Sequence, residues 1–195
     1  PFTPLPRDRV QVVEDKQIID LGGKRLQVFY APGHAPHHMG LFDLDTNVLW
    51  PGDIAMVHTP GGARGHHDIR PPLFDLDKFL ASVELFRSLK PSMILTFGNP
   101  GGPNFTPDTT LRYAAEDHLA IERICREGMR QKMSFKEIVR KVDEYQDAVG
   151  GNPTGERRES PEFSSGGLSG MLAYINRKNP NLEMPGDFTR RMRGG

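Results

Sequence analysis

Short, mainly hydrophobic stretches separated by polar turn residues occupy the first third of the chain and predict β-strands. Four such stretches lie at residues 18–21, 26–30, 39–43 and 47–50. The first two flank Gly22-Gly23-Lys24-Arg25 and the last two flank Leu44-Asp45-Thr46. Apolar runs joined by a few turn-forming residues are typical of β-hairpins. We therefore predict a run of strands over the first 53 residues, whose end loops carry His34 and Asp53.

Hydrophobic residues change to helical spacing after residue 75. A helix at 77–89, a strand at 92–97 and a series of tight turns at 98–103 are predicted in this order. Asp75 or Asp77 can cap the helix and Pro91 ends it. Before the helix, residues 57–73 are rich in Gly, Pro and His, which predicts a long irregular loop.

The chain becomes mainly helical after about residue 106. Helices are predicted at 107–128, 134–149 and 170–177. Ser134 and Glu137 have the spacing of a capping box, which marks the start of the second of these helices. We therefore divide the chain into a strand-rich part at 1–105 and a C-terminal helical extension at 106–195, with a flexible linker near 150–167.

Charge and cysteine content exclude several classes of function. The chain has 25 basic and 25 acidic side chains, and this balance does not favour a nucleic-acid partner. A single cysteine, Cys125, excludes an internal disulfide and a thiolate metal cluster, and we expect it to be buried and inert. No apolar run approaches the ~20 residues that a membrane span needs. A cytoplasmic location is the default expectation, although a chain that begins at Pro1 leaves open the removal of a preceding segment.

Two short motifs at predicted strand ends carry the candidate chemistry. They are Pro32-Gly33-His34 and Gly52-Asp53. Imidazole and carboxylate groups are common metal ligands, and a short hairpin could bring these two together. The alternative for His34 is a structural hydrogen bond in a turn, and the alternative for Asp53 is an Asx-turn carboxylate. His37 and His38 follow on the same turn, and His58 lies in the loop at 57–73, where it either lines a substrate entrance or is merely solvated.

These motifs resemble the second half of the metallo-β-lactamase fold superfamily. The shared order is a strand, a Pro-Gly-His turn, a hairpin, a Gly-Asp step, a helix, a strand and a tight turn, and it agrees over roughly residues 15–105. The resemblance implies an α/β (α+β) fold: half of an αββα sandwich, followed here by the helical extension.

The resemblance also implies one or two metal ions at the strand ends, usually zinc, with manganese or iron as alternatives. His34 would be a histidine ligand of the first metal, and Asp53 would be the catalytic carboxylate that bridges both. Asn99 stands where the family normally has a further histidine, and its neutral amide is a weaker zinc ligand. His38, His37 and His58 would support the ligands or contact substrate.

The chain departs from the family pattern in lacking the H-x-H-x-D-H signature. The sole Asp-His step is Asp117-His118, and Tyr113 and Ala115 stand where the two preceding histidines should be. That step lies on a predicted helix after the wrong strand, so we reject it as a substitute. Because the signature belongs to the first half of the family fold, we expect that half on another chain or on a segment outside this sequence, and we expect an oligomer.

The resulting hypothesis is a metal-dependent hydrolase that acts on a small-molecule ester, thioester, lactone, amide or phosphoester through a metal-bound water. The alternative is a non-catalytic subunit that keeps the fold and serves as a scaffold or binding partner. A third interpretation is a β-rich binding domain unrelated to this family. We expect neither nucleic acid nor a membrane as a partner.

Overall fold

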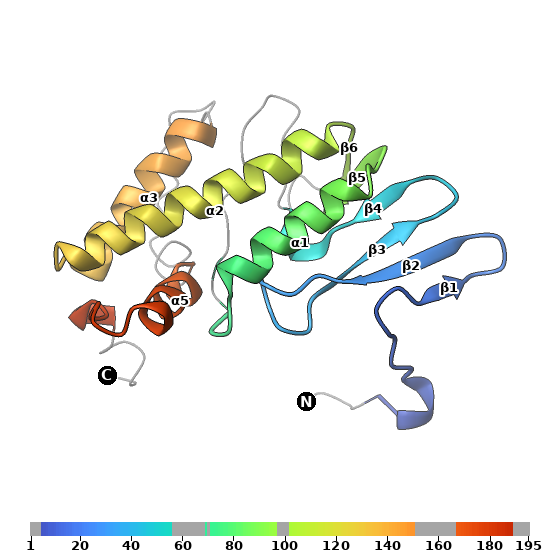
Figure 1. Ribbon diagram of the computed structural model, residues 1–195, viewed down its shortest axis with the longest axis horizontal. Helices are drawn as coiled ribbons and strands as arrows, with labels where there is room; N and C mark the ends of the chain where they lie inside the picture. The colour runs from blue at the N-terminus through green and yellow to red at the C-terminus, as the bar shows by residue number, and fades with distance from the viewer. Residues whose placement is uncertain (1–4, 56–68, 70, 97–101, 151–166, 189–195) are drawn as a thin grey trace.

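A computed structural model describes residues 5–55, 69, 71–96, 102–150 and 167–188 (Figure 1). The strands are β1 (Ile18–Asp20), β2 (Arg25–Tyr30), β3 (Met39–Asp43), β4 (Val48–Trp50), β5 (Met93–Thr96) and β6 (Gly102–Asn104). The helices are α1 (Leu76–Ser88), α2 (Pro107–Arg130), α3 (Phe135–Gly150) and α5 (Ser169–Lys178), with short 3-10 turns η1 (Arg7–Arg9) and η2 (Gly52–Ile54). None of the helices described is long and apolar enough to cross a membrane.

The six strands form one sheet in sequence order, β1-β2-β3-β4-β5-β6. Neighbouring strands are antiparallel except β4 and β5, which run parallel because α1 carries the chain back between them. The predicted hairpins and the strand before residue 97 are thereby confirmed. The prediction of tight turns throughout 98–103 is wrong at its end, because residues 102–104 form β6 on the edge of the sheet. Pro103 weakens the strand signal in the sequence, but an edge strand tolerates a proline because one side of its backbone needs no partner.

Helix α1 covers one face of the sheet and buries the main hydrophobic core. Figure 1 shows α1 lying across the strands. The face it covers carries Phe42 and Leu49, which are cross-strand neighbours and belong to one core cluster with Phe86 of α1. At Gly40 a Cβ atom would lie 2.5 Å from the Phe86 ring, so the absence of a side chain lets the helix approach the sheet. Asp75, one of the two predicted caps, begins α1 by accepting a hydrogen bond from the Lys78 backbone N–H.

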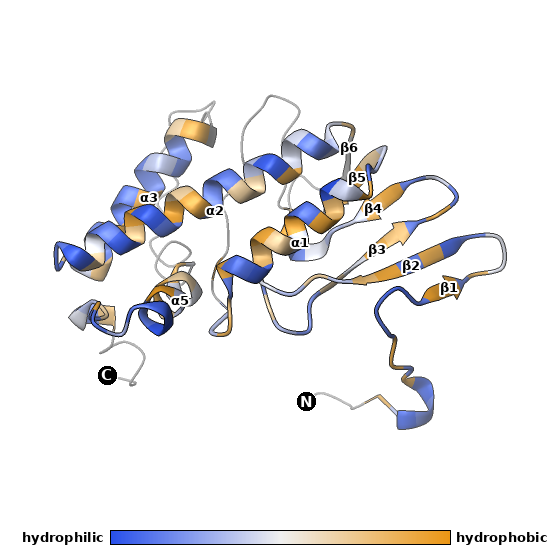
Figure 2. Ribbon diagram, viewed as in Figure 1, coloured by the Kyte–Doolittle hydropathy of each residue, from blue (hydrophilic) through white to orange (hydrophobic). Residues whose placement is uncertain are grey.

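The opposite face of the sheet is also apolar and is partly exposed. We call it the outer face; its residues include Tyr30, Met39, Leu41 and Trp50. Tyr30 and Met39 are 47% and 41% exposed, and Leu41 and Trp50 are half-buried. Figure 2 shows hydrophobic residues along these strands. A continuous apolar surface on a sheet is normally covered by another layer of structure.

The helical part, which consists of α2, α3 and α5, packs onto α1 and shares its core. Helix α2 contacts α1, while α3 and α5 contact α2 (Figure 1). Ser134 and Glu137 form the predicted capping box at the start of α3, with reciprocal bonds of 2.8 Å and 3.3 Å. Cys125 is fully buried in α2, and burial raises the pKa of its thiol, so the prediction of an inert cysteine agrees with its surroundings. Most of the linker predicted near residues 150–167 lies outside the described residues, which end at Gly150 of α3 and resume at residue 167.

The rejected Asp117-His118 step lies in the interior of this helical part. Both side chains are buried on α2, where the Asp117 carboxylate accepts a hydrogen bond of 2.8 Å from the Tyr145 hydroxyl. The His118 ring stacks on Phe79, with centroids 3.9 Å apart. These contacts join helices to one another and leave the two side chains remote from solvent.

Candidate metal centre

The turn that carries His34 connects β2 to β3 and is fixed against α1. The Ala31 N–H donates to the His38 carbonyl at 2.9 Å, which closes the turn. Gly33 has φ +136°, and a Cβ there would lie 2.3 Å from the backbone N and Cα of Phe79. Only glycine lets the turn come so close to the helix. The Gly33 carbonyl accepts a hydrogen bond of 2.8 Å from the Asp75 N–H, so the start of α1 sets the position of His34.

The Gly-Asp step follows β4 and is shaped around the ring of His38. Gly52 has φ +56°, and a Cβ at this position would lie 2.5 Å from His38 Nε2. The backbone N–H of Asp53 donates to the same nitrogen at 2.9 Å. A residue other than glycine at position 52 would push the ring away and break this bond. Glycine is therefore required before Asp53 for its backbone conformation and for the space it leaves.

His38 uses both of its ring nitrogens on backbone groups. Because Nε2 accepts the Asp53 N–H, the proton of the neutral ring lies on Nδ1, which is 3.0 Å from the Ala31 carbonyl. Burial lowers the pKa of the imidazole, while the Ala31 bond and the Asp53 charge oppose that shift. In this geometry backbone groups engage both ring nitrogens, so His38 is not placed as a metal ligand. Its position makes it a support that holds Asp53 in place.

His34 and Asp53 present their side chains to each other. Their Nε2 and Oδ2 atoms are 3.7 Å apart, and the side chains are 18% and 36% exposed. Two ligands of one tetrahedral zinc ion, each about 2.1 Å from the metal, stand roughly 3.4 Å apart. A small adjustment of either side chain would therefore let both bind a single ion. An imidazole nitrogen and a carboxylate oxygen are also donors that zinc, manganese and iron accept, so the pair fits part of a metal-ligand set.

The remaining predicted site residues are either exposed on the turn or outside the described part of the chain. His37 is exposed on the turn. Asn99 and His58 lie outside the described residues. Within the described ranges, no group of three or more His, Cys, Asp and Glu side chains could hold a metal ion. The structure thus brings His34, His38 and Asp53 together, with two of them as potential ligands.

Two contributors to this geometry were missed in the sequence. One is the Ala31 carbonyl, which a residue-type pattern cannot reveal because every residue has one. The other is Ser82 of α1, whose hydroxyl donates to the Pro32 carbonyl at 2.7 Å. A serine among the apolar positions of α1 is the signal that could have pointed to such a bond.

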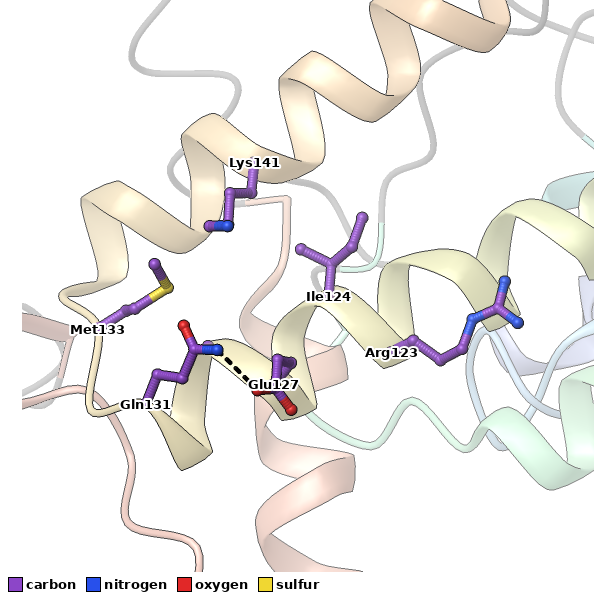
Figure 3. Close-up of a pocket in the computed structure, with 7 residues that line it drawn as sticks. Arg123, Ile124, Glu127, Gln131, Met133 and Lys141 are labelled. Atoms are coloured by element: carbon purple, nitrogen blue, oxygen red, sulfur yellow. Dashed lines mark hydrogen bonds between the residues drawn. The ribbon is translucent and has the colours of Figure 1, made fainter.

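A small pocket of about 240 Å³ lies elsewhere, between α2 and α3 (Figure 3). Ile124 and Met133 give it an apolar lining, Lys141 stands at one side, and the Gln131 side-chain amide donates to the Glu127 carboxylate at 2.7 Å. The lining contains no histidine or cysteine. It is therefore separate from the His34–Asp53 pair and lacks the ligands of that site.

Comparison with known proteins identifies the family of this chain. The family model of the metallo-beta-lactamase superfamily matches residues 1–98. A metallo-beta-lactamase fold-containing protein, ST1585 from Sulfurisphaera tokodaii, is 30% identical over 139 residues, which are 71% of this chain and 44% of that protein. The chain thus spans less than half the length of this relative.

Two solved structures share the fold at lower identity. A β-lactamase domain protein from Burkholderia ambifaria aligns over 89% of this chain and 48% of its own, with 21% identity and a TM-score of 0.62. A metallo-beta-lactamase family protein from Thermus thermophilus aligns over 91% of this chain and 50% of its own, with 20% identity and a TM-score of 0.60. Coverage of this size includes most of the helical part as well as the sheet. The chain belongs to the metallo-beta-lactamase superfamily.

Proposed function

We propose that this chain supplies His34 and Asp53 to the metal centre of a hydrolase. Members of the superfamily are generally metal-dependent hydrolases. The observation that carries the proposal is the 3.7 Å approach of His34 Nε2 to Asp53 Oδ2, with both side chains accessible. Zinc is the metal that best suits this pair, as one or two ions, with manganese or iron as alternatives.

Each residue of the site has a separate task in this proposal. His34 would hold the metal through Nε2, and Asp53 would hold it through its carboxylate and would orient a water. His38 holds the Asp53 backbone at 2.9 Å and so keeps the carboxylate turned toward His34. Asn99 would be a weaker ligand or would act through a water, and His37 and His58 would contact substrate. When bound, zinc would supply activation of a water near neutral pH and polarisation of the attacked carbonyl or phosphoryl oxygen.

The substrate class follows from that chemistry. The chemistry that zinc would supply suits substrates with an electrophilic carbon or phosphorus that carries a leaving group. Esters, thioesters, lactones, amides and phosphoesters of small molecules meet this requirement, and the described part of the chain favours none of them over the others.

We further propose that the outer face of the sheet packs against the half of the fold that carries the H-x-H-x-D-H signature. The support is the run of partly exposed apolar residues Leu41, Trp50, Tyr30 and Met39 on that face, and the span of less than half of the archaeal relative. That half, the first of the family fold, would lie on another segment or another chain. A stable monomer of residues 1–195 that binds zinc without any other segment would contradict this proposal.

Metal analysis of the protein purified in its natural assembly tests the proposed function. We expect one or two equivalents of zinc, manganese or iron after dialysis, and loss of most of that metal in His34→Ala and in Asp53→Ala. Asp147→Ala, which removes an exposed carboxylate on α3, is the control and should retain the metal. A panel of ester, thioester, lactone, amide and phosphoester substrates then assigns the reaction. Full activity in either site variant would contradict the assigned roles.

A non-catalytic subunit is the second candidate function. Asn99 in place of a histidine, and a sequence without the H-x-H-x-D-H signature, favour it. Such a subunit would keep the fold and act as a scaffold or binding partner. The same metal analysis separates the two candidates, because the scaffold should hold no metal when its natural partner is present.

A further inference from the structure

The C-terminal helix α5 is fastened to the segment that leads into α1. The Arg177 guanidinium donates to the carbonyls of Pro72, at 3.0 Å, and of Phe74. The Tyr174 hydroxyl donates to Asp77 Oδ1 at 2.9 Å, and Lys178 Nζ lies 2.6 Å from Asp77 Oδ2. Three side chains on one helix therefore hold residues 72–77.

The other end of α5 approaches the same segment through its backbone. The Gly170 N–H donates to the Ile69 carbonyl at 2.7 Å. A Cβ at Gly170 would lie 2.4 Å from the carbonyl oxygens of Ile69 and Pro71. This close approach depends on glycine, so α5 has little freedom to shift along the segment.

The start of α1 in turn determines where the His34 turn lies. The Pro32 carbonyl accepts from Ser82 Oγ at 2.7 Å, and the Gly33 carbonyl accepts from the Asp75 N–H at 2.8 Å. Gly33 also lies against the backbone of Phe79. Both carbonyls immediately before His34 are therefore bonded to α1 and not to a neighbouring strand.

Aromatic packing makes the connection between α5 and the turn continuous. The Phe74 ring meets Tyr174 of α5 edge-on, with centroids 6.3 Å apart, and lies 5.9 Å from the ring of Phe79. His118 stacks on both phenylalanine rings. A shift of α5 would disturb Phe74, and Phe79 contacts the turn directly.

We propose that α5 positions His34, with Tyr174, Arg177 and Lys178 as positioning residues that act through Asp77 and the start of α1. The inference rests on the proposed function only in the identity of His34 as a ligand. It gives the helical part a task in the site, even though none of these three side chains contacts His34. Loss of the α5 contacts should loosen the turn and weaken metal binding while the core stays folded.

The chain contains a matched control for this proposal. Tyr145 of α3 donates its hydroxyl to the Asp117 carboxylate at 2.8 Å, just as Tyr174 of α5 donates to Asp77 at 2.9 Å. The Tyr145 bond joins α3 to α2 and touches neither α1 nor the turn. Replacement of each tyrosine by phenylalanine therefore removes the same kind of bond at two different places.

Hydrogen exchange in the metal-free protein tests the proposal directly. In Tyr174→Phe/Lys178→Met, we expect the hydrogen-bonded amides of Asp75, Ala31 and His38 to exchange about five times faster, since one lost hydrogen bond shifts a local opening equilibrium by roughly that factor. Tyr145→Phe should leave these amides within about twofold of the wild type. Tyr174→Phe/Lys178→Arg keeps the ion pair with Asp77 and should recover part of the protection.

Zinc affinity of the same variants separates this inference from the proposed function. At temperatures well below unfolding, Tyr174→Phe/Lys178→Met should raise the zinc Kd about fivefold, and Tyr145→Phe should leave it unchanged. Unchanged exchange at the Asp75, Ala31 and His38 amides, or an equal zinc Kd in Tyr174→Phe/Lys178→Met and Tyr145→Phe, would overturn the positioning role. Absence of zinc binding by the wild type in its natural assembly would instead contradict the proposed function, while the exchange result would still decide whether α5 controls the turn.

Discussion

The candidate metal centre and the helical part of the molecule are stabilised by different kinds of contact. At the metal centre, backbone groups make the decisive bonds: the Asp53 N–H to His38, the His38 ring to Ala31, and Asp75 to Gly33. In the helical part, wholly buried side chains such as those of Ile121 and Ile138 fill the space between helices.

Because of this difference, the two regions should respond differently to amino-acid substitutions. Two glycines at the site have positive φ and leave no room for a Cβ atom, so added volume there displaces the backbone. In the helical part a smaller side chain leaves a cavity but keeps the backbone path. Substitutions of the site glycines should therefore displace the backbone that positions His34 and Asp53, whereas cavity-forming substitutions between α2 and α3 should lower mainly the free energy of unfolding.

Gly33→Ala should have the largest effect. The added Cβ would lie 2.3 Å from the Phe79 backbone, and φ is +136°. We expect a loss of about 4 kcal/mol of unfolding free energy, from overpacking and backbone strain together. Urea unfolding measures it. Gly22→Ala is the control, because φ there is also positive but no atom lies within 4 Å, so the loss should be about 1 kcal/mol. Equal losses in the two variants would contradict the close approach of the turn to α1.

Ile121→Ala should cost about 3 kcal/mol of unfolding free energy, because the side chain is wholly buried and its removal leaves a cavity. Under conditions where the variant is folded, its zinc Kd should match that of the wild type. Urea unfolding and a zinc titration on the same sample check both parts. A large rise in the zinc Kd of the folded variant would break the distinction between the two regions.

His38→Ala should weaken zinc binding by about 10- to 100-fold, as is usual when a residue that orients a ligand is removed. The cause is the loss of the acceptor for the Asp53 N–H. A competition titration with a chelator gives the affinity. His38→Gln should recover part of it, because its amide oxygen can accept in place of Nε2. A zinc affinity equal to that of the wild type in His38→Ala would rule out the supporting role.

Asp77→Asn should have the smallest effect, below about 1 kcal/mol at pH 7, because the carboxylate is largely exposed and its ion pair is screened. Hydrogen bonds from Lys178 and Tyr174 lower the pKa of Asp77 below its ordinary value of 3.8. The stabilisation is therefore complete above that value and is lost as the pH falls through the lowered folded-state pKa. Urea unfolding of both proteins at pH 7 and pH 3 should show a difference that narrows in acid. A difference that widens at pH 3 would contradict the sign.

Much of the fold could be predicted because local patterns and tertiary contacts agree. The strands from β1 to β5 follow from short apolar runs bounded by turn residues, and α3 begins at the predicted Ser134–Glu137 box. The approach of His34 to Asp53 follows from the placement of both at strand ends joined by a hairpin.

The rest of the structure depends on contacts that leave no local pattern. Strand β6 exists because the edge of β5 offers backbone partners, and its own residues Gly102–Asn104 have little strand propensity. The bond between Tyr174 and Asp77 joins residues 97 positions apart, so no periodicity reveals it. Both ring nitrogens of His38 bond to backbone groups, and such partners cannot be recognised from residue types.

Anomalous diffraction at the zinc edge, from crystals of the natural assembly, tests the central claim most directly. The account predicts a peak within about 2.1 Å of His34 Nε2 and of an Asp53 carboxylate oxygen, with His38 outside the coordination sphere. Its remaining ligands would come from residues outside the described ranges or from the half of the fold that carries the H-x-H-x-D-H signature. A peak coordinated by His38, or a metal centre that excludes His34 and Asp53, would contradict the account.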